Sequence, residues 1–217
     1  MNGYTVLDYL PGLTDFHPEN NNTVLIMANN TTHEPSFLQA PDYRPVPVVS
    51  NYGEGKFSRE AAYHVNAASI KRLGEWFNFL KAQEAYDNTR FILVSDHGPE
   101  PNFLIKSSLP FNIEQFNALL MVKDFGSSGP MKTNWTFMSN ADTPCLAMQG
   151  QFENPVNPFT GKPLTMEEKK ASPLYIAVSV SIHLGDPKAR IFALNPKLDY
   201  YIHDNIFDPN NWKKVEE

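Results

Sequence analysis

Three short apolar runs and one long amphipathic stretch carry the clearest hydrophobic pattern in the chain. The runs Thr23–Met27, Phe91–Val94 and Ala118–Val122 are bounded by polar or turn-forming residues, which predicts buried strands. Apolar and small residues also recur at steps of three and four from Ala62 to Leu80, which predicts a helix that starts near Ser58. A helix that connects two buried strands is typical of an α/β layer, so we expect a mostly parallel sheet flanked by helices.

The pattern changes beyond Gly150. Just before it, a short helix is predicted at Asp142–Gln149, where the carboxylate of the first residue can cap the free backbone N–H groups. After it, Leu174–Ile182 and Ala189–Leu194 alternate between apolar and polar positions or run apolar, and Tyr200–His203 can add a further strand. These segments predict a small antiparallel sheet that follows the α/β layer.

Length and composition fit one packed domain. The 217 residues contain 41% hydrophobic side chains, which is enough for one sizeable core. Charged residues make up 19% and aromatic residues 12%, a profile of a globular protein and not of a disordered chain. We therefore expect a single domain over residues 1–217, with the α/β layer in 1–150 and the antiparallel subdomain in 151–217.

Charge and apolar runs exclude two classes of partner for the chain as given. The net charge is −6 and no run of Lys or Arg exceeds two residues, so the basic surface of a nucleic-acid binder is missing. No stretch approaches the roughly 20 apolar residues that a membrane span needs. The single cysteine, Cys145, cannot form an internal disulfide and leaves the redox compartment undecided.

The four residues Ser95, Asp96, His97 and Gly98 follow directly on the predicted strand Phe91–Val94. A carboxylate and an imidazole at the end of a strand can both turn into one cleft, and a glycine lets the backbone bend there. Oxygen and nitrogen ligands of this kind suit Zn²⁺ or Mn²⁺, ions that stabilise charge on a phosphoryl or sulfuryl group. Asp96 and His97 are therefore candidate metal ligands.

This motif has two other interpretations. An Asp–His pair at a strand end can simply cap a turn, and the four residues alone do not decide between capping and metal binding. A catalytic triad of Ser95, His97 and Asp96 is discounted, because neighbours on an extended chain point to opposite sides and cannot form the required relay.

His33 is a further candidate, because it follows the predicted strand Thr23–Met27 at its polar end. In a parallel sheet it would reach the same edge as Asp96. The alternative is a loop histidine that hydrogen-bonds to Thr31 or Glu34.

Two segments resemble motifs of the alkaline-phosphatase/sulfatase superfamily. Residues Ala85 to Gly98, AYDNTRFILVSDHG, resemble the carboxy-terminal metal motif of sulfatases and of bacterial phosphoglycerol and phosphoethanolamine transferases. Residues Thr31 to Pro35, TTHEP, resemble the His-x-Pro loop of the same enzymes. The resemblance covers roughly Thr23 to Val122, and Phe137–Pro144 fits the helix that usually follows.

The resemblance implies a metal-dependent enzyme that acts on phosphate or sulfate esters. Asp96 and His97 would bind the divalent ion, with Zn²⁺ or Mn²⁺ ahead of Ca²⁺ and Mg²⁺, and His33 would contact the transferred group. The leading reaction is phosphoglycerol-type transfer to a surface glycan or lipid. Hydrolysis of sulfate esters is one alternative, and a non-catalytic module that binds a glycan or a protein is another.

The chain also departs from the family pattern. The family carries a threonine, serine or modified cysteine nucleophile and an acidic metal ligand upstream of the His-x-Pro loop, and neither is recognisable here, so no catalytic nucleophile is assigned. We therefore expect the carboxy-terminal part of a longer protein, inactive by itself. In the transferase branch, upstream helices would anchor that protein to the membrane, with this part on the extracytoplasmic face of a bacterial cell.

Overall fold

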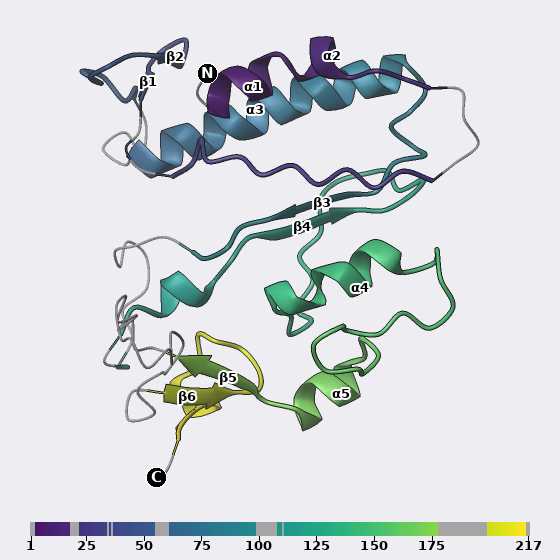
Figure 1. Cartoon of the computed structure of the whole chain (residues 1–217). Helices are drawn as coiled ribbons and strands as arrows, with labels where there is room; N and C mark the ends of the chain where they lie inside the picture. The colour runs from purple at the N-terminus through teal and green to yellow at the C-terminus, as the bar shows by residue number, and fades with distance from the viewer. Residues whose placement is uncertain are drawn as a thin grey trace, which may run out of the picture. The chain divides into compact units, whose positions relative to one another are not determined.

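The computed structural model describes residues 3–17, 22–33, 35, 37–54, 61–98, 108–109, 111–177 and 199–215 (Figure 1). The chain divides into two compact units, an amino-terminal unit, Met1–Thr89, and a carboxy-terminal unit, Arg90–Glu217. Each unit has its own core and is described by itself. None of the helices in the described part of the chain combines the length and the apolar character that a bilayer crossing requires.

The amino-terminal unit is built on one long helix. Helix α3 (Ala61–Ala82) is accompanied along its length by the short helices α1 (Gly3–Asp8) and α2 (Leu10–Leu13) (Figure 1). A minimal antiparallel hairpin of β1 (Leu38–Gln39) and β2 (Arg44–Pro45) completes its regular structure. The core of the unit consists of the buried side chains Tyr4, Leu38, Val65 and Ala68, with Tyr43 packed against them.

Helix α3 agrees with the predicted helix, because its buried face follows the predicted apolar spacing. Val65, Ser69 and Leu80 are buried at the expected three- and four-residue steps. The indole N–H of Trp76 donates to the hydroxyl of Thr14 at 2.8 Å, which joins α3 to the end of α2. The predicted start at Ser58 lies outside the described residues.

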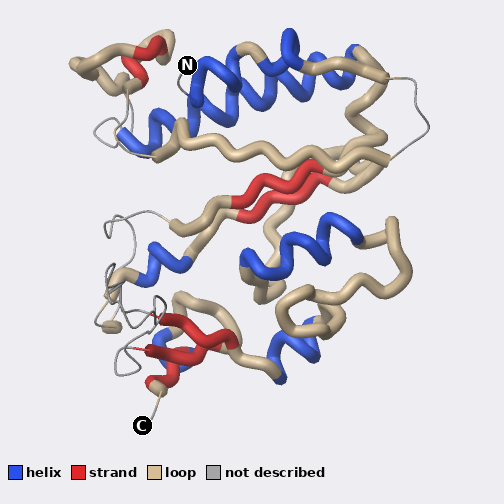
Figure 2. Tube along the Cα trace, in the orientation of Figure 1, coloured by secondary structure: helices blue, strands red, loops and turns tan. Residues whose placement is uncertain are grey.

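The carboxy-terminal unit begins with a two-stranded ribbon, in which β3 (Phe91–Val94) pairs with β4 (Leu120–Lys123). Helix α4 (Thr143–Met148) and helix α5 (Met166–Ala171) follow (Figure 2). A second sheet contains β5 (Leu174–Ala177), β6 (Asp199–Ile202) and β7 (Trp212–Lys214), in the order β5-β6-β7. Three 3₁₀ helices complete the described structure: η1 (Ile113–Phe116), η2 (Asn140–Asp142) and η4 (Pro209–Asn211).

Aromatic side chains fill the core of this unit. Ile113, Phe137, Ile202 and Trp212 are buried together. Phe111 makes edge contacts with Trp212 at a centroid distance of 5.1 Å, an arrangement that adds to the stabilisation from burial alone. The core therefore ties η1 to the β5-β6-β7 sheet.

Arg90 links the β3–β4 ribbon to α4. Its guanidinium donates hydrogen bonds to the carbonyl oxygens of Leu146, Ala147 and Gln149, at 3.0, 3.1 and 2.6 Å. A cation at this position satisfies the free carbonyls at the end of the helix and complements the helix dipole. The Arg90 guanidinium also donates to the carboxylate of Asp124, just after β4. These hydrogen bonds hold the pKa of the Asp124 carboxyl below its ordinary value.

The predicted α/β class with a mostly parallel sheet is wrong. All strand pairs among the described residues are antiparallel, in sheets of two, two and three strands. The backbone N–H of Ser95 donates to Leu119 O, and that of Gly98 donates to Gln115 O, which extends the β3–β4 pairing beyond the strand ends. The chain therefore returns alongside itself, and a parallel pair would instead need a crossover connection.

The predicted buried strand Thr23–Met27 is also wrong. These residues are exposed and belong to no strand, and Ile26 is 90% exposed. A continuous apolar run indicates burial only where a sheet offers partners on both sides. In the described residues no strand pairs with this segment.

The segments after Gly150 form the antiparallel β5-β6-β7 sheet. Strand β5 covers the first part of the predicted Leu174–Ile182, and β6 overlaps the predicted Tyr200–His203. Residues 178–198, which include the predicted strand Ala189–Leu194, lie outside the described residues. Asp142 does not cap α4 with its side chain, because its carboxylate is used by other donors.

Candidate functional site

The chain bends sharply where β3 ends, and Ser95 fixes the first step of the bend. Its hydroxyl donates to the carbonyl of His97 at 2.9 Å and accepts from the backbone N–H of Leu119 at 2.7 Å. Its own N–H donates to Leu119 O at 3.1 Å. Ser95 is therefore used by the backbone on both sides of the bend.

Gly98 is required by close approach of another backbone segment. Its N–H donates to Gln115 O at 2.8 Å, and a Cβ at this position would lie 1.9 Å from Glu114 O and 2.8 Å from Asn117 O. Real Cβ atoms do not approach backbone oxygens so closely. The glycine thus lets the bend pack directly against η1.

The side chains of Asp96 and His97 point into solvent beside one another. They are 85% and 48% exposed, with 3.7 Å between Asp96 Oδ2 and His97 Nε2. His97 Nδ1 lies 2.6 Å from Gly98 O, and a carbonyl can only accept, so this hydrogen bond requires the proton on Nδ1. Nε2 of the neutral ring then carries the lone pair that a metal needs.

The two side chains fit part of the coordination shell of a divalent ion. Two ligands with bonds of about 2.0–2.1 Å to a tetrahedral ion lie roughly 3.3 Å apart. The observed 3.7 Å between Asp96 Oδ2 and His97 Nε2 is close to this value. Among the described residues there is no group of three or more His, Cys, Asp and Glu residues that could hold a metal, so the pair supplies two ligands only.

Asn140, more than 40 residues further along the chain, holds the backbone of the bend Ser95–Gly98, which we call the corner. Its side-chain amide donates to Ser95 O at 2.9 Å and to Asp96 O at 3.0 Å. Ser139 and Asp142 form a capping box on either side, in which the Ser139 backbone N–H donates to Asp142 Oδ2 at 2.8 Å. Sequence reasoning missed this contact, although the spacing of Ser139 and Asp142 is a capping-box signal.

The carboxylate of Asp142 is the centre of a buried polar network. Asn157 Nδ2 donates to it at 2.7 Å, and Lys169 from α5 forms a short ion pair with it. Burial alone would raise the pKa of Asp142, but the hydrogen bonds from Lys169, Ser139 and Asn157 outweigh it and lower the pKa. The carboxylate is therefore ionised and fully used within the fold.

His33 lies in an exposed turn of the amino-terminal unit, where its backbone N–H donates to Asn30 O at 3.2 Å. Asp96 and His97 belong to the carboxy-terminal unit. The expectation that His33 shares a cleft with them therefore stays a prediction.

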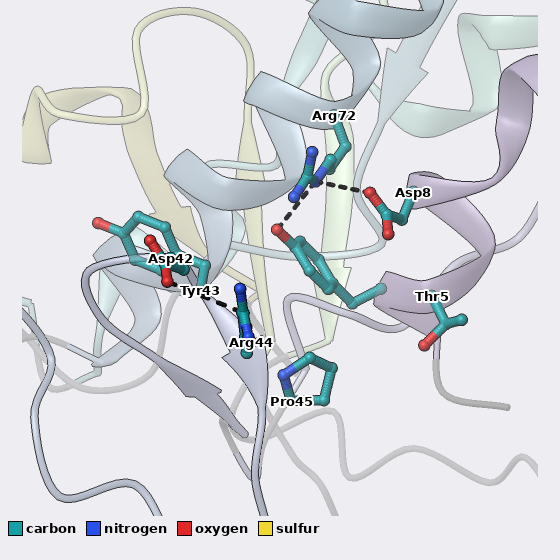
Figure 3. Close-up of a pocket in the computed structure, with 8 residues that line it drawn as sticks. Thr5, Asp8, Asp42, Tyr43, Arg44, Pro45 and Arg72 are labelled. Carbon is teal, nitrogen blue, oxygen red and sulfur yellow. Dashed lines mark hydrogen bonds and ion pairs between the residues drawn. The ribbon is translucent and has the colours of Figure 1, made fainter.

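A pocket in the amino-terminal unit is a second feature with polar walls (Figure 3). It has a volume of about 420 Å³ and lies between α1, α3 and the β1–β2 hairpin. Arg72 is held in it by Tyr4 and Asp8, at 3.0 and 3.1 Å, and Arg44 lies 3.7 Å from Asp42 (Figure 3). Each arginine faces a carboxylate, so the pocket presents no uncompensated positive charge to a phosphate or sulfate group.

Comparison with known protein families, curated proteins and solved structures gave no match to the chain. The superfamily resemblance therefore rests on the motif residues themselves.

Proposed function

We propose that this chain is the carboxy-terminal part of a metal-dependent transferase or hydrolase of the alkaline-phosphatase/sulfatase superfamily. Its substrates would be phosphate or sulfate esters, with phosphoglycerol-type transfer to a surface glycan or lipid as the leading reaction. The enzyme would work on the extracytoplasmic face of a bacterial membrane, to which other parts of the protein would anchor it.

One observation carries the proposal. The hydrogen bond from His97 Nδ1 to Gly98 O leaves Nε2 3.7 Å from Asp96 Oδ2, on side chains that are 48% and 85% exposed. Histidines that bind metals typically donate their other ring N–H to a carbonyl or carboxylate in this way. A turn-capping role explains the bond from the His97 N–H to Asp96 Oδ1, but it does not explain the orientation of the ring.

The division of work follows from these contacts. Asp96 and His97 would hold one face of Zn²⁺ or Mn²⁺, and the ion would stabilise charge on the transferred group. His33, by resemblance, would contact that group. The nucleophile and the remaining ligands would come from residues not assigned in this chain.

A metal titration of the 217-residue chain tests the ligand pair. We expect Zn²⁺ and Mn²⁺ to bind weakly, because two protein ligands leave the ion largely hydrated. Asp96→Ala and His97→Ala should each abolish this binding, as measured by calorimetry with Zn²⁺ and by Mn²⁺-induced broadening of amide signals near the corner. His203→Ala is the matched control, since His203 has no role in the proposal. Tight binding that survives both substitutions would show that the ion is held elsewhere.

An assay on a generic phosphodiester and a generic sulfate ester tests the reaction class. We expect no turnover by the chain alone, because no nucleophile is assigned in it. If the chain hydrolyses either ester and Asp96→Ala abolishes this activity, the result would support an enzyme that acts on phosphate or sulfate esters. The same result would contradict the placement of the nucleophile outside the chain. The preferred ester would then decide between transfer of phosphate groups and the sulfatase alternative.

A non-catalytic module is the second candidate. It is favoured by the absence of a third metal-binding side chain beside Asp96 and His97 in the described residues. Such a module would bind a glycan or a protein without metal, so retention on a glycan array that persists in chelator and in His97→Ala would favour it over the enzyme.

A further inference from the structure

Asn140 connects two segments that are far apart in the sequence. Its amide nitrogen donates to two consecutive carbonyls, Ser95 O at 2.9 Å and Asp96 O at 3.0 Å. A primary amide has two N–H donors, so both are used on the corner. These carbonyls belong to the two residues that follow β3, just past the last residue pair of the β3–β4 ribbon.

The two carbonyls belong to the two peptide units that meet at the Asp96 Cα. Each peptide unit is rigid, so holding both carbonyls restricts the φ and ψ angles of Asp96, which lie between the two units. Asn140 therefore restricts the direction in which the Asp96 side chain leaves the backbone, and with it the distance of 3.7 Å between Asp96 Oδ2 and His97 Nε2.

Asn140 is itself held by a buried anchor. It lies in η2 between Ser139 and Asp142, whose capping box sets the turn. The Asp142 side chain is 1% exposed and is paired with Lys169. The backbone of Asn140 is already fixed by this anchor. Its exposed amide can therefore hold another segment with little further loss of conformational entropy.

We propose that Asn140 is a positioning residue for the Asp96–His97 ligand pair. It touches neither an ion nor a substrate, and it acts by holding the Ser95–Asp96 backbone in the orientation that brings both side chains to one ion. The expected effect of Asn140 on metal binding rests on the proposed function. Its expected effect on the backbone orientation of the corner does not.

The first test needs no metal. In Asn140→Ala, hydrogen exchange at the His97 and Gly98 amides should become about tenfold faster, because the corner opens more often once its two carbonyls are released. The melting temperature should stay within error of the original chain, since Asn140 is exposed. Asn210→Ala is the matched control, because it removes an exposed amide in η4 that donates to Asp208 at 2.8 Å, and none of its hydrogen bonds within the described residues reaches the corner.

The second test uses Zn²⁺ and Mn²⁺ as probes. Asn140→Ala should weaken the binding that depends on Asp96 and His97 by about tenfold, the lower end of the range for partners that orient metal ligands. Asn210→Ala should bind as the original chain does.

The outcomes separate this inference from the proposed function. Unchanged exchange at His97 and Gly98 in Asn140→Ala would overturn the positioning role even if the original chain binds metal. Faster exchange at these two amides in a chain that binds no metal would support the positioning role and count against the proposed function. Uniformly faster exchange with a lower melting temperature would assign Asn140 a general stabilising role and overturn the inference.

Discussion

Gly98 allows two backbone segments to meet more closely than any side chain would permit. A Cβ at this position would lie 1.9 Å from the carbonyl oxygen of Glu114, so either the bend or η1 has to move to accommodate it. Neither can move without loss, because the Gly98 N–H donates to Gln115 O and Glu114 is buried.

Gly98→Ala should therefore destabilise the carboxy-terminal unit by at least about 2 kcal/mol, as is typical when a packed site is overfilled. Chemical denaturation followed by tryptophan fluorescence measures this, since Trp212 lies in the core of that unit. Gly74→Ala is the control: a Cβ at that position would meet nothing within 4 Å, and in helix α3 it should stabilise by about 0.5–1 kcal/mol. A Gly98→Ala chain of unchanged stability would contradict the packing of the bend against η1.

The Asp142 carboxylate makes the carboxy-terminal unit sensitive to acid. Its pKa is lowered below the ordinary value of 3.8, so the native state keeps it ionised at a lower pH than the unfolded chain does. Its contribution to stability is complete above that ordinary value and is lost as the pH falls through the native pKa. The free energy of unfolding should therefore decrease below about pH 4.

Asp142→Asn should flatten this acid dependence and cost about 3 kcal/mol at pH 7, because Lys169 would be left without its partner. Denaturation curves at several pH values measure both effects. Lys169→Met in the same background should recover part of the loss, since it removes the unpaired cation. An Asp142→Asn chain with an unaltered pH profile would show that other carboxylates govern acid unfolding.

At the scale of elements, Arg90 carries the connection between the β3–β4 ribbon and helix α4. The side chain is 9% exposed and donates to three carbonyls at the end of α4 as well as to Asp124. A lysine has one nitrogen in place of the planar fork, so it cannot serve both sets of partners.

Arg90→Lys should thus lower the free energy of unfolding by about 2 kcal/mol, which corresponds to one or two lost charge-assisted hydrogen bonds. Arg44→Lys is the matched control, because Arg44 is 81% exposed and its pair with Asp42 is long, so a change within about 0.5 kcal/mol is expected. Equal effects of the two substitutions would show that the carbonyl contacts of Arg90 contribute little.

A helix or strand could be predicted where the apolar spacing within its own residues is regular. The segments that it packs or pairs with could not be predicted in this way. Helix α3 and strand β3 follow from the spacing of apolar residues between Ala62 and Val94. The parallel pairing was inferred from a general rule about helix crossovers, whereas β3 pairs antiparallel with β4, and the hydrogen bonds from Ser95 to Leu119 and from Gly98 to Gln115 lie past the strand ends. The contact of Asn140 with the corner spans more than 40 residues and leaves no periodic trace in the sequence.

At the scale of the whole molecule, the chain consists of two units with separate cores. Two cores that do not share buried residues need not melt together. The single domain predicted from length and composition would instead unfold in one step.

We expect thermal unfolding to show two transitions. Gly98→Ala should lower the midpoint of one of them, and Trp76→Phe, which removes the bond to Thr14, should lower that of the other. Differential scanning calorimetry of the two variants checks this, with native-state hydrogen exchange to assign each transition to its unit. A single transition lowered by both variants would favour one cooperative domain.

The exposed segment Thr23–Met27 has a consequence for how the protein behaves at high concentration. It belongs to no helix or strand, it is mostly apolar and uncharged, and Leu25 and Ile26 are 75% and 90% exposed. Short stretches with these properties and strong β propensity are templates for intermolecular strand stacking. Flanking asparagines add no charge that would oppose such stacking, so Leu25→Lys is expected to raise the concentration up to which this chain stays in solution.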